Sequence, residues 1–98
     1  MKVYLDDIRE APEGWVCVRT YTDMISMVDS FVIEELSLDH DLGEEKTGYD
    51  ILCYMEEKKS REPHYLLPNE ITIHTSNPVG RAKMMQAIFS LERFRGFV

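Results

Sequence analysis

The sequence is poor in cysteine, and it has no long apolar run. Its two cysteines, Cys17 and Cys53, stand in a predicted strand and a predicted helix, without the short spacing of a metal site. We therefore expect them to be reduced core residues of a cytosolic protein. No stretch approaches the ~18 consecutive apolar residues of a membrane span, and no signal peptide precedes the first strand. The sequence predicts a soluble, cytoplasmic protein without a membrane partner.

Basic residues are also scarce, with 11 Lys and Arg against 18 Asp and Glu and a formal net charge of -7. No basic run is available to replace the counterions of a polynucleotide, which argues against generic binding to nucleic-acid backbones. An anionic ligand would need local help from a metal, an arginine or a helix N-terminus. The 98 residues, 44% of them apolar and 30% charged, predict a single domain, residues 1–98, with one modest core.

Short apolar strands alternate along the chain with amphipathic segments. Composition predicts strands over residues 2–5, 15–21, 36–39 and 70–75. Apolar spacing of three and four residues predicts a helix capped by Thr22, one opened by Thr47-Gly48, and one started by Asn77-Pro78. The expected buried positions are Met24, Ile25, Val28, Phe31 and Val32 in the first helix, Ile51, Leu52 and Met55 in the second, and Ala82, Met85, Ile88 and Phe89 in the third.

This order of elements predicts an α/β fold with an open, mainly parallel sheet and helices on both faces. Right-handed crossovers place the C-terminal ends of the strands at one edge, where such sheets keep their ligand crevice. Three strand ends bring polar residues to that edge, namely Asp6 and Asp7, then Asp39, His40 and Asp41, and finally His74, Thr75, Ser76 and Asn77. A chemical site is therefore expected there.

The candidate metal ligands are four carboxylates, Asp6, Asp7, Asp39 and Asp41. Carboxylate oxygens suit Mg²⁺ or Mn²⁺, and such an ion would offset the repulsion between the acids and polarise a phosphoryl oxygen. Structural roles are the alternative. Asp6 and Asp7 would then satisfy turn amides, and Asp41 would cap the turn before Gly43.

The candidate catalytic residues are Asp39, His40 and His74. The two histidines titrate near neutrality, so either could move a proton to or from an attacking water or a leaving hydroxyl. The alternatives are a charge partner of the neighbouring acids for His40 and a satisfied structural histidine for His74. The arginines and the helix start at Asn77 could bind a phosphate, although Arg81 could equally be solvated. The candidate phosphate-binding residues are Arg9, Thr75, Ser76, Asn77 and Arg81.

The motifs at these strand ends carry a family resemblance. VYLDD, LSLDHD and ITIHTS resemble the phosphoacceptor site of the response-regulator receiver domain. LDDIR, SLDHDLG with the following TGYD, and IHTSNPVGR resemble more closely the small family of cyclic-phosphate-processing receiver domains, over nearly the whole chain. The resemblance implies a flavodoxin-like, three-layer sheet of four to five strands in the order 2-1-3-4(-5). It also implies a small phosphorylated or cyclic-phosphate ligand, such as a nucleotide or an RNA end.

Two departures from the receiver pattern are visible. A loop over residues 9–14 replaces the helix between the first two strands. No Lys follows Lys83, so the Lys that ends the fifth strand of a receiver is missing, and residues 93–98 leave at most a stub of that strand. Ordinary phosphorelay signalling is therefore not expected.

Three functions follow from these observations. The first is a metal-dependent, phosphoesterase-like enzyme that processes a cyclic or terminal phosphate. The second is a non-catalytic receiver relic that binds a protein partner through its helical face. The third, a phosphoacceptor in signalling, is weakened by the missing Lys.

Overall fold

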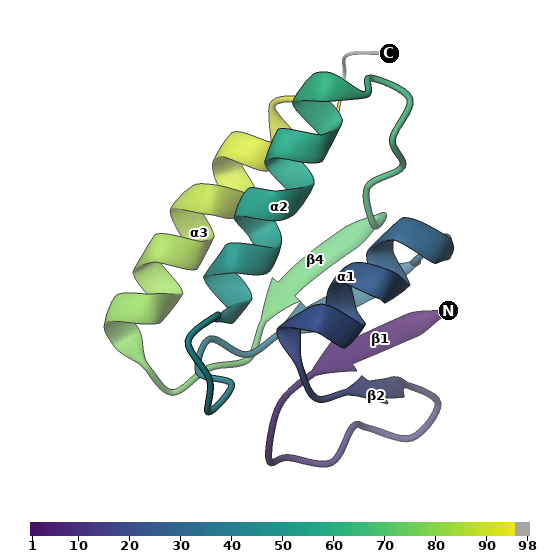
Figure 1. Ribbon diagram of the computed structural model, residues 1–98. Coiled ribbons are helices and arrows are strands. Elements are labelled where there is room, and N and C mark those ends of the chain that lie inside the picture. Colours follow the sequence, from purple (N-terminus) through teal and green to yellow (C-terminus); the bar gives the residue numbers. More distant parts are fainter. Residues whose placement is uncertain (96–98) are drawn as a thin grey trace.

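The computed structural model describes residues 1–95. Its sheet has the order β2-β1-β3-β4 with every pair parallel, and no helix joins β1 to β2 (Figure 1). The expected receiver-like α/β fold, strand order and missing first crossover helix are thus confirmed. The expected stub of a fifth strand falls at residues 93–98, of which 96–98 lie outside the described residues. The elements are β1 (Lys2–Leu5), β2 (Val16–Val18), α1 (Tyr21–Ser30), β3 (Glu35–Leu38), α2 (Gly48–Arg61), β4 (Glu70–Ile73) and α3 (Pro78–Glu92).

Side-chain caps determine where the helices begin. α2 has a capping box, in which Thr47 and Asp50 satisfy each other's backbone amides, and the Asn77 side chain accepts from the Gly80 N–H at 3.0 Å at the start of α3. These two predicted starts are confirmed. The predicted cap of α1 is wrong, because Thr20 rather than Thr22 has the extended backbone and accepts the Asp23 N–H.

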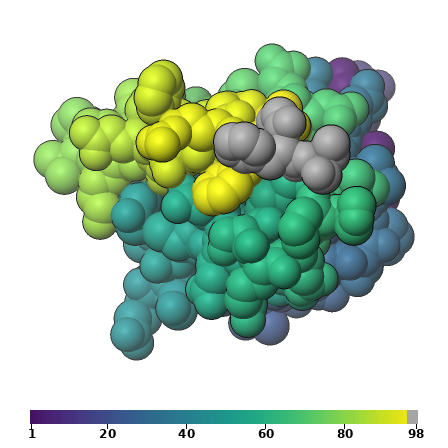
Figure 2. All heavy atoms as spheres, turned by 90° about the horizontal axis from the view of Figure 1, so that it is seen from above, coloured from purple at the N-terminus to yellow at the C-terminus, as the bar shows by residue number. Residues whose placement is uncertain are grey.

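All three helices cover one face of the sheet. Alternate residues of a strand point to opposite faces, and the strand register places one set of apolar residues on the helical side. Apart from Val16, which is exposed, these residues pack in a single cluster against α1, α2 and α3. The space-filling view shows α3, in yellow-green, lying along α2, in green (Figure 2). The strand residues of this face are Val3, Leu5, Val16, Val18, Leu36, Leu38, Ile71 and Ile73.

The expected cover on both faces is therefore wrong for residues 1–95, which form two layers. Right-handed crossovers that run in the same direction along a sheet lie on the same face. The connections from β2 to β3 and from β3 to β4 run in one direction, and only the connection from β1 to β2 runs the other way. Because that connection has no helix, the opposite face carries side chains such as Tyr4, Cys17, Ser37 and Thr72 without a helical layer above them.

Several expected core positions lie at the surface instead. In α3 the buried side chains are Met84 and Leu91, whereas Ala82, Met85 and Phe89 are exposed. The prediction failed because α3 carries apolar residues on two sides and spacing alone does not select the one that packs. Phe31 and Val32 follow the end of α1 and are exposed. Both cysteines are exposed as well, so their expected place in the core is wrong.

Because of the backbone pairing, the strands end at the same edge of the sheet, and the polar residues that follow them lie close together there. The Asp6 N–H donates to Val18 O, the Asp39 N–H to Leu5 O, and the His74 N–H to Leu38 O, each at 3.0 Å. Gly43 turns the chain after β3 with a φ of 68°, a conformation that favours glycine. Of the helices described, none combines the length and the apolar character that crossing a membrane requires.

The start of α2 packs closely on the end of β3, and a substitution at Gly48 can test this contact. A Cβ added at Gly48 would lie 1.8 Å from the backbone oxygen of Asp39. We predict that Gly48→Ala lowers the free energy of unfolding by about 1–3 kcal/mol or more, because a backbone contact cannot give way cheaply. Urea unfolding measures the change, with Ser60→Ala on the exposed side of α2 as the control. Equal stabilities of the two variants would contradict the packing.

Candidate functional site

Three of the predicted ligand carboxylates converge at the C-terminal edge of the sheet. Asp6, Asp7 and Asp39 each offer one oxygen, and these oxygens all lie within 4.8 Å of one another. Asp6 and Asp7 follow β1, and Asp39 follows β3, so the pairing of these two strands brings them together. We call these three residues the acid cluster. Two unit charges at this separation repel by roughly 3 kcal/mol at an effective dielectric constant of about 20, so the cluster favours a cation.

Asp6 is the buried member of the cluster, with 1% of its surface exposed. Its Oδ1 accepts the N–H groups of Ile8 at 2.9 Å and Arg9 at 2.8 Å, and its Oδ2 lies 3.0 Å from His74 Nε2. Burial raises the pKa of Asp6, but these three hydrogen bonds together hold that pKa below its ordinary value. Asp6 is therefore an ionised carboxylate fixed by its donors.

The other two carboxylates of the cluster have few protein partners. Asp39 Oδ1 accepts the His40 N–H at 2.8 Å. Within residues 1–95, no Lys or Arg forms an ion pair with Asp7 or Asp39, whereas Arg9 Nε lies 4.0 Å from Oδ2 of Asp6, the buried member of the cluster. Two half-buried acids without a cation, beside a third that is fully buried, fit a divalent ion with oxygen ligands.

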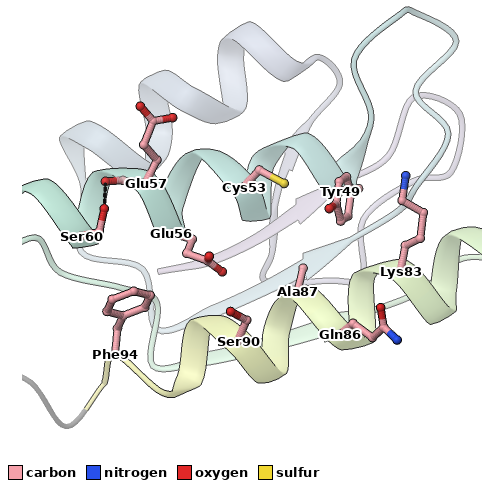
Figure 3. Close-up of a pocket in the computed structure, with 10 residues that line it drawn as sticks. All are labelled: Tyr49, Cys53, Glu56, Glu57, Ser60, Lys83, Gln86, Ala87, Ser90 and Phe94. Carbon is pink, nitrogen blue, oxygen red and sulfur yellow. Dashed lines mark hydrogen bonds between the residues drawn. The ribbon is translucent and has the colours of Figure 1, made fainter.

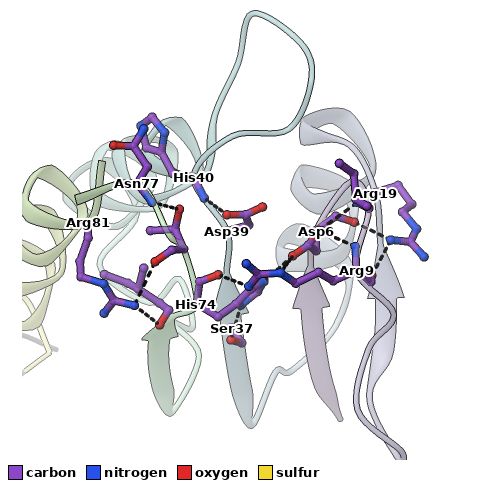
Figure 4. Close-up of polar contacts among 12 residues, drawn as sticks. Asp6, Arg9, Arg19, Ser37, Asp39, His40, His74, Asn77 and Arg81 are labelled. Atoms are coloured by element: carbon purple, nitrogen blue, oxygen red, sulfur yellow. Dashed lines mark hydrogen bonds and ion pairs between the residues drawn. The ribbon is translucent and has the colours of Figure 1, made fainter. Parts of the chain in front are cut away.

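His74 bridges strands instead of facing the pocket. Its Nδ1 lies 2.7 Å from Ser37 Oγ and its Nε2 contacts Asp6 (Figure 4). The ring also stacks on Tyr4 at a centroid distance of 3.9 Å. Burial lowers the pKa of His74, and the nearby Asp6 carboxylate only partly opposes this effect. The neutral imidazole is thus the form that the fold stabilises.

His40 and Asp41 form a second pair, which borders the acid cluster. His40 Nδ1 lies 3.0 Å from Asp41 Oδ1, and Asn77 donates to Asp41 Oδ2 at 3.3 Å. The hydrogen bond with His40, followed by that from Asn77, lowers the pKa of Asp41 below its ordinary value. The His40 ring packs on the start of α3, where a Cβ at Gly80 would lie 2.5 Å from its Cγ. Asp41 is not one of the three residues of the acid cluster.

A pocket of about 240 Å³ opens above the acid cluster. Arg9 spans its border, donating from Nη1 to the His74 backbone oxygen at 3.1 Å while half its side chain is exposed. Arg81 is turned aside, because its Nη2 donates to the backbone oxygens of Ile73 and Thr75 at the open edge of β4. The residues lining the pocket are Asp6, Asp7, Ile8, Arg9, Asp39, Asp41, Thr75 and Ser76.

Two residues that support the site, Arg19 and Ser37, were not predicted from the sequence. Arg19 donates from Nη1 to the backbone oxygens of Asp6 at 3.0 Å and Arg9 at 2.6 Å, which ties the loop after β1 to β2. Ser37 contacts His74 from the middle of β3. A polar residue in an otherwise apolar central strand is the signal that could have identified Ser37. Arg19 carries no comparable signal.

Comparison with known proteins gives one match. A family model described as Cyclic-phosphate processing Receiver domain matches residues 1–90 of the chain. No curated protein and no solved structure matches the chain.

The environment of His74 predicts how stability depends on pH. Without metal, its imidazole should titrate below the ordinary value of 6.5 in an NMR titration. The unfolded chain then binds the proton more readily than the folded one, so the free energy of unfolding should fall as the pH drops from about 7.5 to about 5.5. His74→Gln should reduce this dependence, with His64→Gln as the matched control. A midpoint at or above the ordinary value would contradict the assigned burial.

Proposed function

The chain belongs to the family of cyclic-phosphate processing receiver domains, and from this we propose that it is a divalent-metal-dependent phosphoesterase acting on a cyclic or terminal phosphate. The observation that carries the proposal is the acid cluster, whose three oxygens lie within 4.8 Å of one another in a pocket that also contains Arg9. Bound Mg²⁺ or Mn²⁺ would supply positive charge to the phosphate and polarise a phosphoryl oxygen. Nucleotides and RNA ends carry such phosphates.

In this proposal some pocket residues bind the cation and others bind the phosphate ester. Asp6, Asp7 and Asp39 would hold the cation. The Arg9 guanidinium, exposed at the border, would bind a phosphate oxygen, because its planar donors match phosphate geometry. The hydroxyls of Thr75 and Ser76 also line the pocket, just before α3, and would donate to the same group.

Hydrolysis adds water across one P–O bond. The water gives its hydroxyl to phosphorus and its proton to a base, and the departing ester oxygen takes that proton back from the base, directly or through solvent, so that the base is restored. Asp41 lines the pocket and contacts His40 at 3.0 Å, so this pair is the proton acceptor that we assign, with His40 holding the proton. His74 does not line the pocket.

A second candidate function, a protein-interaction module, has its own support. Val79, Met85 and Phe89 of α3 are 71%, 54% and 74% exposed, and a groove of about 420 Å³ runs between α2 and α3 (Figure 3). Exposed apolar side chains on one helix are a feature of protein-binding surfaces. This candidate requires no turnover, and it would be preferred if the phosphate assays below were negative.

Metal binding should be visible as stabilisation. We predict that Mg²⁺ or Mn²⁺ raises Tm in a thermal unfolding assay, because a ligand that binds only the folded state stabilises it by mass action. Asp39→Asn should abolish the shift, whereas Glu57→Gln, an acid on the exposed side of α2, should retain it. No shift of the unmodified chain at millimolar metal would contradict the cation site.

Turnover should depend on the same carboxylate. With Mn²⁺ present, we expect at least one member of a panel of 2′,3′-cyclic and terminal nucleotide phosphates to be hydrolysed, as measured by chromatography. Asp39→Asn should lose this activity, and His40→Ala should lower the rate on the order of 10²- to 10⁴-fold if the pair with Asp41 accepts the proton. A stable phosphate adduct on Asp39 after incubation with acetyl phosphate, with no hydrolysis across the panel, would favour phosphoacceptor signalling instead.

A further inference from the structure

The side chains of Ser37, His74 and Asp6 form a hydrogen-bonded chain on the uncovered face of the sheet, and this chain ends at the acid cluster. Ser37 Oγ lies 2.7 Å from His74 Nδ1, and His74 Nε2 lies 3.0 Å from Asp6 Oδ2 (Figure 4). The Tyr4 ring stacks on the imidazole with an angle of 6° between the planes. Because these contacts come from β1, β3 and the end of β4, they fix both the position and the rotation of the imidazole.

The partners also determine the tautomer of His74. Asp6 is ionised and can only accept, so His74 Nε2 must carry the proton and donate it. His74 Nδ1 is then the acceptor, and the Ser37 hydroxyl is its donor. Both ring nitrogens are therefore occupied by protein groups. In this arrangement neither ring nitrogen of His74 is free to bind a substrate directly.

The two oxygens of Asp6 depend on different donors. Backbone amides hold Oδ1, whereas His74 is the only hydrogen-bond donor to Oδ2 among residues 1–95, and Arg9 Nε forms a longer ion pair with Oδ2 at 4.0 Å. Asp6 is almost fully buried, so the loss of this donor would leave a carboxylate oxygen without a hydrogen bond. The carboxylate would rotate toward other donors and change the direction of its remaining lone pairs.

We propose that His74 is a positioning residue which, together with Ser37, orients Asp6 and thereby determines the divalent-cation affinity of the acid cluster. The inference rests on the proposed metal site. Hydrogen-bond partners of metal ligands typically change metal affinity by about 10- to 100-fold. His74 thus acts through Asp6 and not on the substrate.

The test measures the Mn²⁺ dissociation constant of the full chain by isothermal titration calorimetry. His74→Leu should weaken binding by about 10- to 100-fold. His74→Gln, whose amide can donate to Asp6 from nearly the same place, should recover most of this loss. Ser37→Ala removes only the Nδ1 partner and should weaken binding less than His74→Leu does. Tyr4→Phe keeps the stacked ring and should bind like the unmodified chain.

The outcomes separate this inference from the proposed function. If His74→Leu lowers the stability to urea but binds Mn²⁺ as tightly as the unmodified chain, the positioning role is wrong and the metal site remains. If the unmodified chain binds no Mn²⁺, both are wrong. Should His74→Leu fail to fold, equal affinities of Ser37→Ala and Tyr4→Phe would overturn the inference. Long-range ¹H–¹⁵N correlation should show a proton on Nε2 of His74, and a proton on Nδ1 alone would overturn it as well.

Discussion

The electrostatic repulsion within the acid cluster is the constraint on which the rest of the site depends. Asp6, Asp7 and Asp39 are held together by the parallel pairing of β1 and β3, which ends both strands at the same edge. Asp6 can be buried because two amides and His74 satisfy it. Asp7 and Asp39 lack an ion-pair partner in residues 1–95. Under the proposed function a divalent cation would supply that partner, and a phosphate ester would complete the coordination of the cation.

The two-layer arrangement explains how so small a chain supports this cluster. The helices bury the apolar face of the sheet in one continuous core. The opposite face has no helical layer in the described chain. On this face His74 stacks on Tyr4, contacts Ser37 and is hydrogen-bonded to Asp6. In this protein the polar, uncovered face thus supports the site. Parallel sheets are usually covered on both faces, so this use of the face is unusual.

The sequence predicted where the acid cluster forms, but it did not predict that all the helices lie on one face of the sheet. Acids that directly follow apolar strands must meet where parallel strands end, so the convergence of Asp6, Asp7 and Asp39 could be inferred from order alone. The side of the sheet that each helix covers depends on the direction of each crossover, which alternation does not specify. The outward apolar residues of α3, such as Phe89, resemble core positions in spacing. The contact of His74 with Ser37 depends on the register between β3 and β4, which no local pattern encodes.

The central claim is that the acid cluster holds a divalent cation for phosphate chemistry. Crystals grown with Mn²⁺ test it most directly, because anomalous scattering locates the ion independently of any activity. One strong peak is expected within about 2.0–2.3 Å of carboxylate oxygens of Asp6, Asp7 and Asp39. A map without a peak at the cluster, or with Mn²⁺ bound only elsewhere on the acidic surface, would contradict the account.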